Sequence, residues 1–220
     1  MSVKAITEED IKTLETLAAK YPERRSALLP MLHYVQSIQG MVSPAGIQVC
    51  AKVLDLTPAE VAAVATFYTM YKRFPMGKHH IGVCVNTLCA LLGGDDLWKE
   101  LTDTLGIGHD ETTADGLFTL ERIECQAACT VAPVMTVNWE FMDSMNPTSL
   151  RDLIDKLKIG APVQSTRGVQ ITSISDSQRV LAGINDGKYQ ESPLADDSML
   201  AGLRVAKERK MSAPAGKGAK

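Results

Sequence analysis

Two pairs of cysteines constrain the fold of this chain more than any other feature. Cys84 and Cys89 are separated by four residues and Cys125 and Cys129 by three, with 35 residues between the two pairs. Each pair lies in a turn next to a short apolar segment that is typical of a strand, so both pairs can meet at one edge of a sheet. Four thiolates that converge on one point form the donor set of a metal centre.

The spacing within the pairs bears on the identity of the metal. Structural zinc sites with four cysteines usually close each half with a C-x2-C turn, and both pairs here are wider. A two-iron cluster also takes four thiolates and accepts loops of varied spacing. His79 and His80 form no C-x-H or C-x-x-H pair, so a Rieske centre is not indicated. The spacing favours iron and sulfur and leaves a structural zinc protein as an alternative.

A disulfide framework is the other way to use several cysteines, and it fits this chain poorly. The chain has an odd number of cysteines, five, and its first residues lack the apolar core of a signal peptide. With 45% apolar residues among 220, it can bury a core without covalent links. Cys50, the fifth cysteine, lies on an apolar helical face and is predicted to pack in that core.

Charge and hydropathy exclude two further classes of protein. The formal net charge is -3, which predicts no nucleic-acid partner. The longest apolar-rich run, residues 61–70, is far shorter than a membrane-spanning helix, so no direct membrane span is predicted. The expected compartment is the cytoplasm.

The pattern of residues divides the chain into three regions. Residues 1–77 show helical periodicity and are predicted to form a helical bundle. Residues 78–160 read as strand, helix, strand, strand, helix, which indicates a small sheet with helices packed on it. Residues 161–220 are rich in Ser, Gly, Gln, Asp and Ala. They are predicted to form an extended or disordered tail, with partner binding as the alternative function.

Helix start signals are clear in the first region. Thr7, Ser43 and Thr57 are predicted N-caps, because each is followed by the periodic apolar residues of a helix. A further helix is predicted to begin at Ser26 and to end at Gly40. The helix that begins at Thr57 carries an apolar stripe that is predicted to pack in the core. Its aromatic end could instead dock a partner. The stripe consists of Val61, Val64, Phe67 and Tyr68.

Several longer motifs resemble a known family. They are SALLPMLHYVQSIQG, VATFYTMYKRFPMGKHHIGVC, GHDETTADGLFTLERIEC and AACTVAPVM. Over roughly residues 20–160 the chain is similar to the family of E subunits of bacterial NADH:quinone oxidoreductase, respiratory complex I, whose relatives include thioredoxin-like [2Fe-2S] ferredoxins. The family usually has a proline where this chain has Leu88, and a Leu-Gly pair where it has Gln126 and Ala127. These substitutions change the ligand loops and leave the cysteines in place.

The resemblance implies a fold and a ligand set. The fold is α/β (α+β): an N-terminal helical bundle, then a thioredoxin-like [2Fe-2S] domain at residues 78–160, then an extended C-terminal tail. The ligands of one [2Fe-2S] cluster would be Cys84, Cys89, Cys125 and Cys129.

The resemblance also implies a role in electron transfer. The chain would be the non-catalytic electron-carrying subunit of the NADH dehydrogenase module. It would exchange single electrons with an FMN on the partner F subunit during NADH oxidation and quinone reduction. No GxGxxG motif is present, so FMN and NADH are expected on that partner. Through the other peripheral-arm subunits the chain would sit on the cytoplasmic face of the inner membrane. The alternative is the same module in a soluble NAD-linked hydrogenase or formate dehydrogenase.

Overall fold

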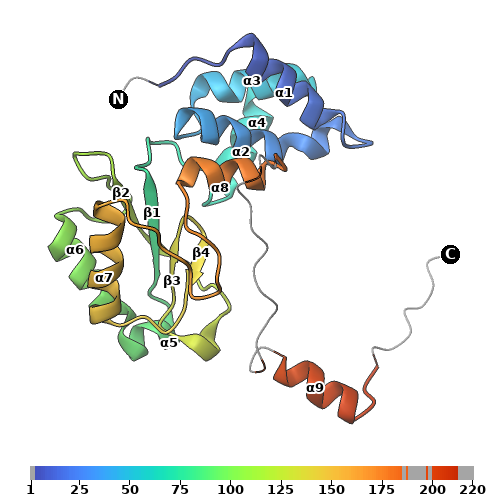
Figure 1. The fold of residues 1–220 in the computed structure, drawn as a ribbon. Coiled ribbons are helices and arrows are strands. Elements are labelled where there is room, and N and C mark those ends of the chain that lie inside the picture. The colour runs from blue at the N-terminus through green and yellow to red at the C-terminus, as the bar shows by residue number, and fades with distance from the viewer. Residues whose placement is uncertain (1–2, 185–186, 188–196, 198–199, 213–220) are drawn as a thin grey trace.

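The computed structural model describes residues 3–184, 187, 197 and 200–212. Helices near the N-terminus form one module, and a four-stranded sheet with its helices forms a second (Figure 1). A short helix, α9 (Ala201–Glu208), stands apart from both. Among the described residues, no helix has the length and apolar character needed to cross a membrane.

The predicted helix caps at Thr7, Ser43 and Thr57 are confirmed. The helix predicted to begin at Ser26 begins instead at Leu28, after a 3-10 turn, and has no side-chain cap. Thr7 and Thr57 each form a capping box, and the Ser43 hydroxyl accepts a hydrogen bond from the Gly46 amide. Each cap replaces a bond that the first turn of a helix lacks and stabilises it by about 1 kcal/mol. The elements are α1 (Glu8–Ala18), the 3-10 helix η1 (Arg24–Ala27), α2 (Leu28–Gln39), α3 (Pro44–Leu54) and α4 (Pro58–Phe67).

The helices of this module enclose one apolar core. Cys50 is completely buried in it, which confirms the predicted core packing. Burial raises the pKa of the Cys50 thiol to about 12, because the thiolate would lose its hydration. Cys50 is therefore an apolar core side chain, distinct from the other four cysteines.

The aromatic end of α4 lies on the surface. Val61 is buried, but Phe67 is 77% exposed and Tyr68 is 45% exposed. The prediction that the whole stripe packs in the core is wrong for these two rings. The helix ends at Phe67 and the backbone at Tyr68 is extended, so helical periodicity no longer directs the Tyr68 side chain. The two rings meet edge to face at 4.9 Å and remain free to contact a partner.

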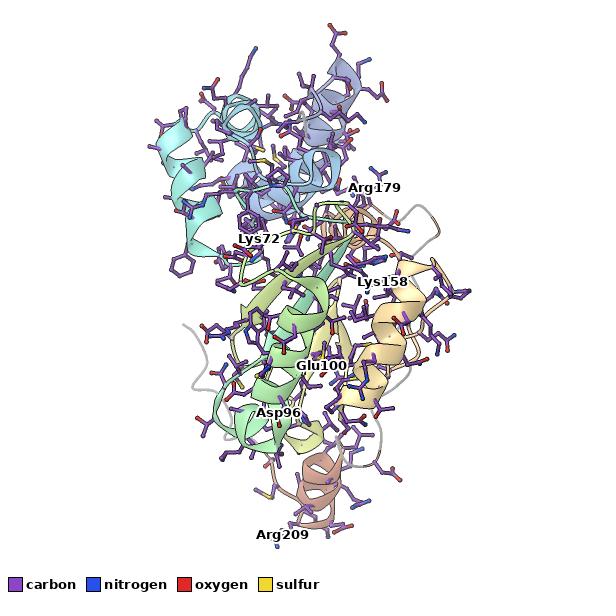
Figure 2. The ribbon with its side chains drawn as sticks, turned by 90° about the vertical axis from the view of Figure 1, so that its left-hand side faces the viewer. Lys72, Asp96, Glu100, Lys158, Arg179 and Arg209 are labelled. Carbon is purple, nitrogen blue, oxygen red and sulfur yellow. The ribbon has the colours of Figure 1, made fainter. Side chains whose placement is uncertain are left out.

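The second module follows the predicted alternation of strands and helices but has one strand more than the predicted order, because β3 and β4 form a hairpin. Its strands are arranged β2-β1-β3-β4, with β1 parallel to β2 and the other neighbours antiparallel. Two helices, α6 and α7, lie side by side on one face of the sheet (Figure 1 and Figure 2). The elements are β1 (His79–Cys84), α5 (Thr87–Cys89), the π-helical turn η2 (Ala90–Gly94), α6 (Asp95–Leu105), β2 (Phe118–Ile123), the 3-10 turn η3 (Cys129–Val131), β3 (Met135–Val137), β4 (Glu140–Met142) and α7 (Pro147–Lys158).

Residues 161–184 fold back onto both modules. Val163 and Ile171 are buried with the sheet and its helices, whereas Ala182 is buried in the core of the first module. The predicted boundary placed every residue after Gly160 in an extended or disordered tail, but residues 161–184 pack against both modules. The few apolar residues of the segment form no core of their own, but they complete the cores of the two modules. Most of the remaining predicted tail lies outside the described residues.

The helix α8 (Ile174–Leu181) makes the contact with the first module. It packs along α2, and the Ser175 hydroxyl donates a hydrogen bond to the Ser37 carbonyl at 2.6 Å. Two residues before α8, the Thr172 carbonyl accepts a hydrogen bond from the side-chain amide of Asn138 at 2.7 Å. The segment therefore bridges α2 and the turn between β3 and β4.

Shortening a buried side chain of this bridging segment should lower the free energy of unfolding. Ile174 is 5% exposed, and Ile174→Ala is expected to lower the free energy of unfolding by about 2–4 kcal/mol, as large-to-small core substitutions do. Leu181→Ala on the same helix is the matched control, because Leu181 is 42% exposed and should contribute within about 0.5 kcal/mol. Urea unfolding of both variants measures the difference. Equal effects would show that α8 is not packed as described.

A buried ionic cluster joins the segment between the modules to the sheet. Lys72, which Figure 2 shows at the boundary of the two modules, places its Nζ 2.5 Å from Oε1 of Glu121 on β2. The Nε2 of His80 on β1 lies 2.8 Å from the other oxygen of Glu121. Burial acts to raise the pKa of Glu121, but His80 and Lys72 outweigh it and hold that pKa below its usual value. Burial lowers the pKa of His80, so the ring is neutral at pH 7.

Candidate metal centre

The parallel strands β1 and β2 bring the two cysteine pairs to the same end of the sheet. Cys84 is the last residue of β1 and pairs with Ile123, the last residue of β2. The chain then leaves both strands in the same direction, toward Cys89 on one side and Cys125 on the other. The topology therefore brings together two pairs that lie far apart in the sequence.

The four thiols are arranged two by two. Cys84 and Cys89 interact directly with each other, as do Cys125 and Cys129, and Cys129 lies close enough to the first pair for their charges to interact. Burial raises the pKa of Cys89 to about 11, and Cys125 raises the pKa of Cys129. Cys84 and Cys89 are buried, whereas Cys125 and Cys129 are exposed. One edge of the site therefore faces the protein and the other faces solvent.

Glycines and one alanine shape the ligand loops. A Cβ on Gly94 would lie 2.7 Å from the Cys84 carbonyl oxygen and 2.8 Å from that of Cys89, so only glycine fits there. Ala127 has a φ of 54°, in the left-handed region that favours glycine. The family that this chain resembles usually has glycine at this position. Alanine there costs about 1 kcal/mol of backbone strain, and the loop keeps its shape despite the substitution.

The buried edge of the site is apolar and supplies hydrogen-bond donors to sulfur. Ile123 and Val134 are buried against Cys84 and Cys89. The Val134 amide acts to lower the pKa of the Cys89 thiol, and the Val134 carbonyl accepts a hydrogen bond from the Cys84 amide at 3.1 Å. The side-chain amide of Asn86 lies 3.9 Å from the Cys84 sulfur. N-H donors directed at ligand sulfurs are a means by which proteins tune an iron-sulfur centre.

The donor set fits a [2Fe-2S] cluster. All four groups are sulfur, and two thiols can bind each of two iron atoms. In the described part of the chain, no three His, Cys, Asp or Glu side chains surround one point closely enough to hold a single metal ion. The pairwise arrangement offers two thiols at each of two positions.

The structure contains site residues that the sequence did not indicate. Asn86 was not predicted, although asparagine directly after a strand and before a helix is a common N-cap. Val134 could not be predicted, because its backbone rather than its side chain makes the contacts. Only the fold places either residue beside the cysteines.

Comparison with known proteins identifies the family of this chain. Residues 14–158 match the thioredoxin-like [2Fe-2S] ferredoxin family. The E subunit of NADH-quinone oxidoreductase from Mycobacterium tuberculosis (strain ATCC 25618 / H37Rv) is 50% identical over 204 residues, which are 92% of this chain and 81% of that protein. NADH-quinone oxidoreductase subunit 2 of Thermus thermophilus is 42% identical over 150 residues, 67% of this chain and 83% of that protein.

A solved structure shares the fold. It is an NAD+-reducing [NiFe]-hydrogenase in the air-oxidized state, similar at a TM-score of 0.55 and 23% identity over 61% of this chain and 23% of that one. At this identity the likeness concerns the fold alone. The family match and the identity to the mycobacterial and Thermus proteins establish the family as well as the fold. The chain belongs to the thioredoxin-like [2Fe-2S] ferredoxin family, among the proteins named as E subunits of NADH-quinone oxidoreductase.

Proposed function

We propose that Cys84, Cys89, Cys125 and Cys129 hold one [2Fe-2S] cluster, and that this chain is the electron-carrying subunit of the NADH dehydrogenase module of respiratory complex I. The observation that carries the proposal is the pairing of the thiols at the end of two parallel strands. The 50% identity to a protein named as an E subunit of NADH-quinone oxidoreductase supports the choice of complex.

The residues around the site would determine how it works. When bound, a [2Fe-2S] cluster supplies one-electron transfer, near about -400 mV for plant-type centres with four cysteines. Ile123 and Val134 exclude water from the buried cysteines, and the Val134 amide stabilises negative charge on Cys89. Cys125 and Cys129 are exposed, so their edge is the one an electron-transfer partner could approach.

The partner must supply the flavin. NADH gives up a hydride, and FMN is needed to divide that hydride into single electrons. Because the chain carries no GxGxxG motif, we assign FMN and NADH to the F subunit, with the other peripheral-arm subunits as further partners on the cytoplasmic face of the inner membrane. A cluster of low potential beside the flavin would hold one electron briefly and shorten the lifetime of a reactive flavin radical.

The described part of the predicted tail has the character of a binding segment. α9 has no buried residue, and Leu203 and Val205 on it are exposed. Isolated helices of this length are marginal in water, so α9 gains stability from contact with another surface. The basic residues in and directly after α9 predict an acidic surface on a partner subunit. They are Arg204 and Lys207 on the helix and Arg209 and Lys210 after it, and Glu208 is the single acid among residues 201–210.

Electron exchange with the flavin can be tested in the reverse direction. The chain is reduced with dithionite, freed of excess reductant and exposed to NAD+, with and without the FMN-binding subunit. NAD+ is expected to reoxidise the cluster only when that subunit is present. Reoxidation of the chain alone, or none in the pair, would contradict the proposal.

The second candidate is the same module in an NAD-linked hydrogenase. The fold shared with the NAD+-reducing [NiFe]-hydrogenase is the observation that favours it. Purification of the intact complex separates the two. Quinone-dependent NADH oxidation identifies the respiratory enzyme, and hydrogen-dependent NAD+ reduction identifies the hydrogenase.

A further inference from the structure

Asn86 occupies a helix cap but does not act as one. It is the N-cap residue of α5, with the extended backbone typical of that position, φ -74° and ψ 161°. At the corresponding positions of α1 and α7, the side chains of Thr7 and Asn146 accept hydrogen bonds from the first turn of the helix. The Asn86 side chain makes no such bond. It therefore gives up the usual stabilisation of an N-cap, and its contacts elsewhere indicate the reason.

Its amide nitrogen faces two acceptors that belong to different ligand loops. Nδ2 donates a hydrogen bond to the Ile123 carbonyl at 3.4 Å and lies 3.9 Å from the Cys84 sulfur, within the range of a weak N-H···S bond. A carboxamide nitrogen has two N-H groups, so it can serve both acceptors together. Ile123 comes two residues before Cys125. One side chain thus links the sulfur of the first pair to the backbone that leads to the second.

The contact between Asn86 and the Cys84 sulfur is shielded from water, which strengthens its electrostatic interaction. Cys84 is 1% exposed, so water does not compete with Asn86 for its sulfur. In such a low-dielectric site a fixed N-H dipole interacts more strongly with charge than it would in water. One-electron reduction adds a negative charge that is shared with the ligand sulfurs. The dipole therefore favours the reduced form over the oxidised one.

We propose that Asn86 is a positioning residue that raises the reduction potential of the cluster held by these cysteines, through its link between the Cys84 sulfur and the Ile123 carbonyl. The proposal rests on the proposed function only in requiring that the four cysteines bind a [2Fe-2S] cluster. It assigns to this side chain a role that neither its type nor its place at a helix start indicates.

Three substitutions of Asn86 remove or weaken its hydrogen-bond donor to different extents. Asn86→Ala removes it and is expected to lower the equilibrium constant for reduction about tenfold, equal to about 59 mV for one electron. Asn86→Asp removes it and adds a negative charge, so the potential should fall at least as far. Asn86→Ser keeps a hydroxyl donor and should lie between wild type and alanine. Thr87→Ala is the control, because the exposed Thr87 is adjacent in sequence, and it should leave the potential unchanged.

The measurement is an EPR-monitored redox titration of each purified variant, with iron and sulfide content determined in parallel. A wild-type potential in a fully loaded Asn86→Ala protein overturns the proposal, and so does an equal shift in all three variants. If Asn86→Ala fails to load, the order of the Ser and Asp variants decides. Absence of a [2Fe-2S] signal from the wild-type protein would instead refute the proposed cluster itself.

Discussion

Replacement of Cys129 with alanine is expected to abolish the two-iron EPR signal of the complex while NADH oxidation by ferricyanide persists. With three cysteine sulfurs left, one of the two iron positions lacks a ligand. The remaining cysteine of that pair, Cys125, is exposed to water. The hydride is accepted by flavin on another subunit, so ferricyanide can still draw electrons from it. The measurement combines EPR of the dithionite-reduced complex with NADH:ferricyanide activity.

Cys50→Ala is the matched control for that experiment. Cys50 is a cysteine of the same chain, fully buried in the helical module and remote in the fold from the candidate site. It should reduce stability without affecting the signal. A two-iron signal of full strength in Cys129→Ala would contradict the ligand assignment. Complete loss of flavin reduction in that variant would contradict the separation of flavin and cluster between two subunits.

Replacement of Lys72 with methionine is expected to lower the free energy of unfolding by about 3–5 kcal/mol at pH 7. Methionine fills most of the space, but Glu121 loses the cation that lies 2.5 Å from its carboxylate and remains buried beside a neutral His80. The cost is removed by uptake of a proton, either by Glu121 itself or by His80, whose pKa Lys72 helps to lower in the wild-type protein. The loss should therefore shrink as the pH falls toward the usual carboxyl pKa, because a protonated Glu121 needs no counter-ion.

The double variant Lys72→Met, Glu121→Gln separates charge from packing. It should recover most of the lost stability at pH 7, because no unpaired charge is then buried. Lys99→Met is the control, since Lys99 also pairs with a carboxylate but is 75% exposed, and its effect should be far smaller. Urea unfolding of the four proteins at pH 7 and pH 5 provides the data. If the double variant is no more stable than Lys72→Met, the buried charge is not the cause.

Local chemistry explains which parts of the fold could be predicted from the sequence. The caps at Thr7, Ser43 and Thr57 depend on residues within one turn, and the structure has them as predicted. The core packing of Phe67 and Tyr68 was mispredicted. For Tyr68 the reason is that periodicity indicates a helical face but not where the helix stops.

The remaining features depend on contacts between distant residues. Lys72 and Glu121 are 49 residues apart. Each lies in one of the segments that resemble the family, but nothing in either segment indicates that the two side chains pair. Segment 161–184 contains too few apolar residues to indicate a core by itself, and it is buried only because two modules already exist for it to cover. Composition therefore predicted a tail where the structure has a bridge.

The candidate site divides in the same way. The four cysteines could be recognised from their spacing, because thiolate is a distinctive ligand. Their pairing depends on β1 and β2 being parallel neighbours, which no local pattern specifies. The roles of Asn86 and the Val134 backbone follow from that pairing and were not predictable.

An EPR spectrum of the dithionite-reduced protein, with iron and sulfide analysis of the same sample, is the decisive test that the four cysteines hold one [2Fe-2S] cluster. The expected result is two iron and two sulfide per chain and the signal of a single two-iron centre. A colourless, EPR-silent protein containing one zinc per chain would contradict it.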